Sequence, residues 1–187
     1  MKIICLYFCL FSFSANAQTK NIAVPDGVSK YFTNGFIPLD VAYGDINNDK
    51  YDDIIVILHD PSEDTIHSQN VRRPLLLLLN GRDQTYKLAA RNDNVVHCVH
   101  CGGMFDPYNE ITIKKGYFSI EHYGGLSMRW THIITFKYSE IDNDWLLHKD
   151  GTTYFHSSTP EKVKTEIKTV KQFGRILFKD YNNEDEE

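Results

Sequence analysis

The pattern of hydrophobic and polar positions along the chain predicts strands rather than helices. Residues 54–58 form a continuous apolar run rich in β-branched side chains, which is typical of a strand buried on both faces. Residues 75–79 form a second apolar run, which closes at Asn80-Gly81 and is too short for a helix. We therefore expect residues 54–58 at the centre of a sheet, with residues 75–79 and then 86–90 as further strands.

Apolar and polar residues alternate further along the chain, as expected for strands with one face in the core. Residues 111–120 predict a hairpin that turns at Lys115-Gly116. Residues 130–138 alternate over their whole length, and residues 145–148 follow them after a turn as the expected partner strand.

Helical periodicity is weak except at residues 160–170, where Thr159 can cap and Pro160 can open a short helix. Aromatic residues make up 13% of the chain, which suits strands better than a helical bundle. The expected fold class is therefore mainly β: a single-domain antiparallel sheet or sandwich-like meander with at most one or two short helices.

The first 17 residues have the composition of a signal peptide. Lys2 precedes an apolar run that is too short to span a bilayer as a helix, and Ala15-Asn16-Ala17 forms a small-x-small cleavage signal. We expect the mature chain to be exported, periplasmic or secreted, with no membrane span after cleavage. The expected division is residues 1–17 as signal peptide, 18–34 as an irregular arm, 35–180 as a β-rich domain and 181–187 as an acidic disordered tail.

Charge narrows the range of partners. Removal of the signal peptide takes away Lys2 and changes the formal net charge from −5 to −6. Nucleic acid is therefore not expected as a partner, because its phosphates attract basic surfaces.

An acidic loop precedes the first apolar run. The side chains of Asp45, Asn47, Asp49 and Asp53 fall at positions 1, 3, 5 and 9 of this loop, with the Tyr51 carbonyl at position 7. Oxygen ligands converge on a hard cation such as Ca²⁺ in this way, and carboxylates this close repel one another unless a positive charge lies among them. The alternative interpretation is an ordinary Asp/Asn turn before a strand.

Residues 44–54 read Gly-Asp-Ile-Asn-Asn-Asp-Lys-Tyr-Asp-Asp-Ile. This run is similar to the Gly-Asp-x-Asn-x-Asp-Gly-x-x-Asp loop of FG-GAP repeats (VCBS-type, integrin β-propeller-like). The resemblance implies Ca²⁺ as the ligand of the loop, although a single copy cannot form a propeller. Lys50 stands where the family has Gly, so we expect Lys50 in a left-handed conformation at a cost of about 1 kcal/mol.

A second cluster reads His97-Cys98-Val99-His100-Cys101. Thiolates interleaved with imidazoles could bind Zn²⁺, and a Cys-x-x-Cys pair could also be a redox dithiol. An exported chain with two remaining cysteines favours a disulfide between Cys98 and Cys101. We therefore prefer the disulfide over Zn²⁺ as a cofactor at these cysteines.

A third group, His122, Tyr123, Arg129 and Trp130, lies around a Gly-Gly pair. These residue types anchor many interfaces and could form a surface that binds a protein partner. The alternative, which we prefer, is a hairpin whose aromatic residues fill the core. Ser127 lies in no Gly-x-Ser-x-Gly motif, so nothing supports a serine hydrolase.

The segment Cys-x-x-Cys-Gly-Gly with a following Asp-Pro, and the later Tyr-Gly-Gly and Arg-Trp, resemble a group of uncharacterised exported bacterial proteins. This resemblance implies export and a shared fold but no activity. We expect a non-enzymatic exported binding or interaction protein that uses Ca²⁺ structurally. The alternatives are a periplasmic inhibitor or immunity protein against a cell-wall-directed enzyme, and a metal-assisted hydrolase that acts through the acidic loop.

Overall fold

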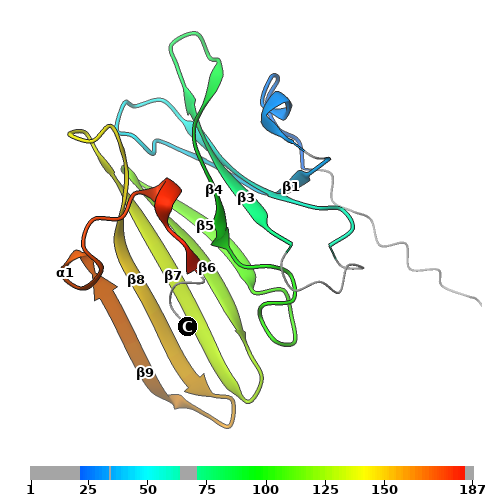
Figure 1. The fold of residues 1–187 in the computed structure, drawn as a ribbon, viewed down its shortest axis with the longest axis vertical. Coiled ribbons are helices and arrows are strands. Elements are labelled where there is room, and N and C mark those ends of the chain that lie inside the picture. The colour runs from blue at the N-terminus through cyan, green and yellow to red at the C-terminus, as the bar shows by residue number, and fades with distance from the viewer. Residues whose placement is uncertain (1–21, 34, 64–70, 184–187) are drawn as a thin grey trace, which may run out of the picture.

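The computed structural model describes residues 22–33, 35–63 and 71–183, and it contains two antiparallel sheets that pack against each other (Figure 1). Within each sheet the strands lie in chain order, so the β-rich meander predicted from the sequence is confirmed. The four-stranded sheet contains β1 (Ile37–Gly44), β2 (Asp53–His59), β3 (Arg73–Asn80) and β4 (Tyr86–Val96). The five-stranded sheet contains β5 (Tyr108–Lys114), β6 (Tyr117–Gly125), β7 (Met128–Ser139), β8 (Asp144–His156) and β9 (Thr159–Thr169).

The main core lies between the two sheets. Alternate residues of β2 and β3, such as Ile55 and Leu77, face the alternate residues Phe118 and Phe136 of β6 and β7. Phe178 inserts between these two rings, with its centroid 5.6 Å from that of Phe118 and 5.2 Å from that of Phe136. The period-2 alternation predicted for residues 130–138 is therefore confirmed.

A second core lies on the other face of the four-stranded sheet. The N-terminal arm, which includes the 3₁₀ helix η1 (Ser29–Tyr31), packs Val28 against Ile54 and Leu76. Its Tyr31 hydroxyl donates a hydrogen bond of 3.2 Å to the Tyr86 carbonyl. Because both faces of β2 and β3 are covered, these two inner strands are apolar at every position in their centres.

The helix predicted at residues 160–170 is wrong, because this segment forms the edge strand β9 (orange in Figure 1). β9 pairs with β8 through Val163 and Phe155 and through Thr165 and Thr153. A helix follows only at α1 (Val170–Phe173). The charged side chains that alternate along β9 protect an exposed sheet edge. The helix was predicted from Thr159 and Pro160, which here begin the strand instead.

The β-rich domain includes more of the C-terminal segment than predicted. The 3₁₀ helix η2 (Phe178–Asp180) is followed by Tyr181, which is buried, so the domain extends past residue 180. The Asn92 amide donates hydrogen bonds to the carbonyls of Phe178 and Tyr181, at 2.5 and 2.8 Å. The predicted signal peptide and residues 184–187 of the predicted tail lie outside the described residues. In the described part of the chain, no helix is long and apolar enough to cross a membrane.

Candidate metal-binding sites

The acidic loop connects β1 to β2 and coils around the carboxylate of Asp45. This carboxylate accepts backbone N–H groups from Asn47 at 3.3 Å, Asp49 at 3.1 Å and Lys50 at 2.9 Å. The carboxylate of Asp49 in turn accepts the Tyr51 N–H at 2.8 Å. The loop is therefore wound around the carboxylates of Asp45 and Asp49.

Three of the predicted ligands meet at the centre of this loop. Asp45, Asp49 and Asp53 each offer a carboxylate oxygen, and these oxygens lie within 4.8 Å of one another. Asp53 is fully buried, and its two oxygens accept the N–H groups of Ile46 at 3.0 Å and Asn80 at 2.9 Å. Burial raises the pKa of Asp53 to about 6, and repulsion from Asp49 and Asp45 adds to the effect of burial.

The other two predicted ligands adjoin the three carboxylates. The Asn47 side chain donates to Asp49 at 2.9 Å and accepts the Asp49 N–H at 3.1 Å. Tyr51 follows with its N–H held by Asp49, and Lys50 has the predicted left-handed conformation, with φ at 74°. The loop thus adopts the expected backbone conformation although it lacks the glycine at this position.

Cys98 and Cys101 form a disulfide, as the sequence predicted. The bond closes a tight turn directly after His97, in the loop that links β4 to β5. The carbonyl of Gly102, the residue after Cys101, accepts the Gly125 N–H at 2.8 Å, so this loop docks onto the end of β6.

Glycine is required next to this contact, at Gly124. A Cβ at Gly124 would lie 2.5 Å from the Trp130 ring, so glycine permits the close packing of β6 against this ring.

The four residues predicted to bind a partner lie on two faces of the five-stranded sheet. His122 is fully buried, and the Trp130 ring lies 5.8 Å from that of His97 on the inner side. Tyr123 and Arg129 lie on the outer face, where the guanidinium of Arg129 lies 5.8 Å from the centroid of the Tyr123 ring. Successive residues of a strand point to opposite faces, so these four residues do not form one surface.

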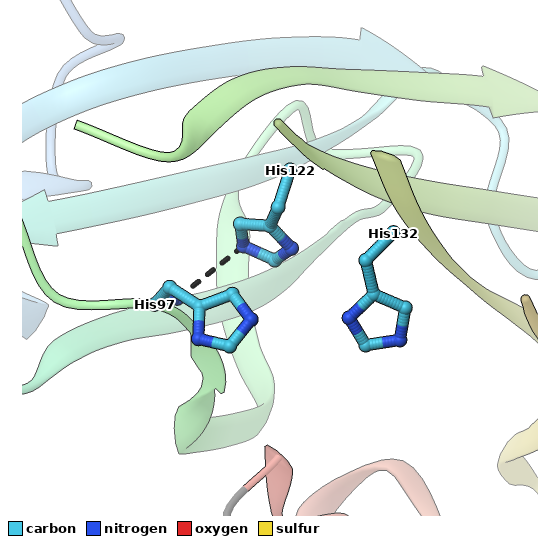
Figure 2. A group of neighbouring side chains, drawn as sticks. All are labelled: His97, His122 and His132. Carbon is cyan, nitrogen blue, oxygen red and sulfur yellow. Dashed lines mark hydrogen bonds between the residues drawn. The ribbon is translucent and has the colours of Figure 1, made fainter. Parts of the chain in front are cut away.

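Three histidines from distant parts of the sequence meet in the interior of the protein (Figure 2). His97 follows β4, and His122 and His132 pair directly across β6 and β7. One nitrogen from each ring lies within 4.8 Å of the others. Sequence analysis placed His97 beside the cysteines and assigned His122 to the possible partner surface, and it did not bring the three together. The hairpin register was the signal that could have paired His122 with His132.

Hydrogen bonds orient two of the three rings. Asp150 on β8 accepts a hydrogen bond from His132 Nε2 at 2.7 Å and another from the Tyr181 hydroxyl at 2.6 Å. The backbone N–H of His97 donates to His122 Nε2 at 3.3 Å. The other nitrogen of His122, Nδ1, is buried and has no hydrogen-bond partner among the described residues.

Burial disfavours the protonated form of two of the three rings, His97 and His122. It lowers the pKa of His97 to about 4, with a further contribution from His132, and it lowers the pKa of His122 well below the usual range. Burial raises the pKa of Asp150, but the hydrogen bonds from His132 and Tyr181 and the nearby positive charge of Lys168 together outweigh burial and hold the pKa below its ordinary value. The rings of His97 and His122 are therefore neutral at pH 7, and Asp150 is ionised.

A buried ion network lies next to the histidine cluster. The Arg73 guanidinium is fully buried and forms paired hydrogen bonds with Glu63, at 2.6 and 2.9 Å, and with Asp106, at 2.6 and 2.7 Å. It also donates to the His97 carbonyl at 3.4 Å. The His59 ring lies on the other side of Glu63, with its Nδ1 2.9 Å from the carboxylate. Two carboxylates, one guanidinium and one imidazole therefore make up the network beside the cluster.

Comparisons with protein-family models, curated proteins and solved structures found no match for this chain. The resemblance of residues 44–54 to FG-GAP loops therefore stays a prediction from the sequence. The acidic loop and the histidine cluster are the basis for the functional proposals below.

Proposed function

We propose that this protein is an exported, non-enzymatic binding protein whose two sheets are held together by Ca²⁺ in the acidic loop. The observation that carries the proposal is the approach of the Asp45, Asp49 and Asp53 oxygens to within 4.8 Å of one another. Carboxylate oxygens at this spacing repel, and Ca²⁺ is the hard cation that such oxygen ligands prefer. The side chains of Asp45, Asn47, Asp49 and Asp53 and the Tyr51 carbonyl would hold it.

The contacts of the loop support a structural role for the ion. The Trp145 indole of β8 donates to the Ile46 carbonyl at 2.8 Å, and the Gly116 N–H of the β5–β6 turn donates to the Asp45 carbonyl at 3.1 Å. Asp53 begins β2 and accepts the N–H of Asn80 at the end of β3. A cation that orders this loop would therefore stabilise both sheets.

The outer face of the five-stranded sheet supports the binding role. Tyr123 stacks on Phe155 with ring centroids 6.5 Å apart, and Arg129 lies over the Tyr123 ring. Tyr123 is 39% exposed and Val163, which pairs with Phe155, is 60% exposed. Tyrosine and arginine are common anchors of protein interfaces, so a protein is the partner that this face fits best.

The disulfide supports export, because such bonds form and persist in oxidising compartments. Its formation accords with the signal peptide predicted at residues 1–17. Cell fractionation with an antibody to the protein tests this part of the proposal, and retention of the full-length chain in the cytoplasm would contradict it.

Thermal unfolding with and without Ca²⁺ tests the calcium part. A ligand that binds only the folded state, at a concentration of 100 times its Kd, adds about 2.7 kcal/mol to the free energy of unfolding. For a domain of this size, this increment raises the Tm by about 5 °C or more. Asp49→Asn should abolish the increment. Asp52→Asn is the matched control, because Asp52 is an exposed carboxylate in the same loop. Coincident wild-type curves with excess Ca²⁺ and with chelator would overturn the proposal.

Chemical cross-linking in an extract of exported proteins tests the binding part. The wild-type protein should give a cross-linked product of defined mass, and the double variant Tyr123→Ser/Arg129→Ser should not. Tyr43→Ser is the control, because Tyr43 is a similarly exposed tyrosine on β1. A product that survives the double variant would place the binding surface elsewhere.

A further inference from the structure

We propose that His97, His122 and His132 form a second metal site, which binds one divalent transition-metal ion and prefers Zn²⁺ over Ca²⁺. The site is separate from the acidic loop in residues and in ligand chemistry. Imidazole nitrogen suits Zn²⁺, Cu²⁺ and Ni²⁺, whereas Ca²⁺ takes oxygen ligands.

The spacing of the three rings fits such an ion. Zn–N bonds of about 2.0–2.1 Å in a tetrahedral site place two ligand nitrogens about 3.4 Å apart. The three nitrogens already lie within 4.8 Å of one another, so the rings need to approach by no more than about 1.4 Å. Figure 2 shows a nitrogen of each ring facing the space between them. Side-chain rotations of His97, which lies in a loop, can supply part of this movement.

Asp150 prepares His132 as a ligand. Because the ionised Asp150 accepts a hydrogen bond from Nε2, that nitrogen carries the ring proton, and Nδ1 presents a lone pair. The Tyr181 hydroxyl holds the second oxygen of Asp150 at 2.6 Å. A carboxylate that fixes the tautomer of a histidine is the usual outer partner of a histidine ligand to zinc.

His122 has a buried nitrogen without a hydrogen-bond partner, which is unusual in a protein core. Its Nε2 accepts the His97 N–H, so a neutral ring places its proton on Nδ1, which is buried without a partner among the described residues. Buried polar atoms are normally paired. A metal ion at Nδ1 would use the lone pair of this atom once its proton has moved to Nε2. The long hydrogen bond from the His97 N–H to Nε2 would then be lost, because a protonated ring nitrogen cannot accept it.

The surrounding charges favour a divalent ion. Asp150 contacts the cluster directly, and Glu63 and Asp106 share the single guanidinium of Arg73. With every imidazole counted as uncharged, including the His59 ring beside Glu63, three negative charges and one positive charge leave a formal charge of −2. A divalent cation would neutralise it, so the site does not need to bury an uncompensated charge.

Titration of the purified protein with Zn²⁺ by calorimetry tests the proposal. Excess Ca²⁺ is present throughout, so that the acidic loop does not compete for the added Zn²⁺. The wild-type protein should bind one Zn²⁺ per chain. Asp150→Asn should weaken binding about 10- to 100-fold, which is the usual effect of losing such an outer partner, and His97→Gln and His132→Gln should weaken it further. His148→Gln and His156→Gln, which remove exposed imidazoles, should leave it unchanged.

Nitrogen NMR of the histidine rings in the wild-type protein gives a readout that does not depend on a variant folding. One equivalent of Zn²⁺ should shift the ring nitrogens of His97, His122 and His132 and leave those of His148 and His156 in place. Two results would overturn the proposal: no Zn²⁺ binding by the wild-type protein, or full affinity in His97→Gln and His132→Gln. Asp49→Asn, which tests the calcium loop, should bind Zn²⁺ with the affinity of the wild type. The calcium proposal and the zinc proposal can therefore be tested independently.

Discussion

The indole N–H of Trp145 donates a hydrogen bond of 2.8 Å to the carbonyl of Ile46, and this bond joins the two sheets. Both side chains are buried in the main core. Ile46 is the second residue of the acidic loop, so the candidate calcium site is anchored in the core rather than suspended at the surface. This relationship explains why an ion bound in the acidic loop would affect the stability of the whole domain.

Replacing Trp145 with phenylalanine should destabilise the protein by about 2–3 kcal/mol. The substitution leaves the Ile46 carbonyl buried without its donor and removes part of a well-packed indole. Urea unfolding measures the change. Tyr138→Phe is the control: it removes an exposed hydrogen bond to Asn143, so it should change the stability by no more than about 0.5 kcal/mol. Equal effects of the two substitutions would contradict the anchoring role of Trp145.

Asp53 should give the metal-free protein a characteristic dependence on pH. Since burial raises the pKa of Asp53 to about 6, the folded state holds a proton that the unfolded state has already lost. The resulting contribution to stability is present below about pH 4 and is lost as the pH rises through 6. Between pH 4.5 and 7.5 the loss should reach about 2 kcal/mol.

The contribution of Asp53 is isolated by comparison with Asp53→Asn in the presence of a chelator. The free energy of unfolding of the wild type relative to this variant should fall as the pH rises from 4.5 to 7.5. With excess Ca²⁺ the trend should reverse, because the ion needs the ionised carboxylate. A difference that is constant with pH in the chelated protein would show that Asp53 does not titrate in this range.

The buried guanidinium of Arg73 should be among the most sensitive positions in the protein. Arg73→Met leaves the buried Glu63 with only the His59 ring as a partner, and breaking a buried ion pair in this way costs about 3–5 kcal/mol. Arg72→Met is the matched control, because Arg72 is the adjacent arginine and makes an exposed contact with Asn94. Chemical denaturation should separate the two variants by at least about 2 kcal/mol. Similar stabilities would mean that the Glu63 carboxylate reaches water when Arg73 is lost.

The acidic loop could be found from the sequence because its candidate ligands lie within nine consecutive residues, where spacing alone largely determines geometry. The histidine cluster could not, because it depends on the register of β6 with β7 and on the course of the loop after β4. β9 was missed for a different physical reason: both of its faces are largely exposed, so its alternating charged residues mark no buried face, and Thr159-Pro160 resembles the start of a helix. The inner strands β2 and β3 could be predicted from the sequence because both of their faces are covered, which makes them continuously apolar.

The disulfide should contribute little to global stability and more to the position of His97. Its loop contains only two residues between the cysteines, so the double variant Cys98→Ser/Cys101→Ser should lose no more than about 2 kcal/mol. The bond begins one residue after His97, however, and fixes the turn that carries the ring toward His122. If the histidine cluster binds Zn²⁺, the double variant should therefore bind it more weakly than the wild type.

Two measurements on this variant separate the two effects. Urea unfolding gives the change in stability, and Zn²⁺ titration at a temperature where both proteins are fully folded gives the change in affinity. The Ca²⁺-dependent increase in Tm should be the same in both proteins, because the acidic loop and the disulfide lie on different connections. Unchanged Zn²⁺ affinity in the folded double variant would show that the hydrogen bonds of the His97 backbone with Arg73 and His122 position its ring without the disulfide.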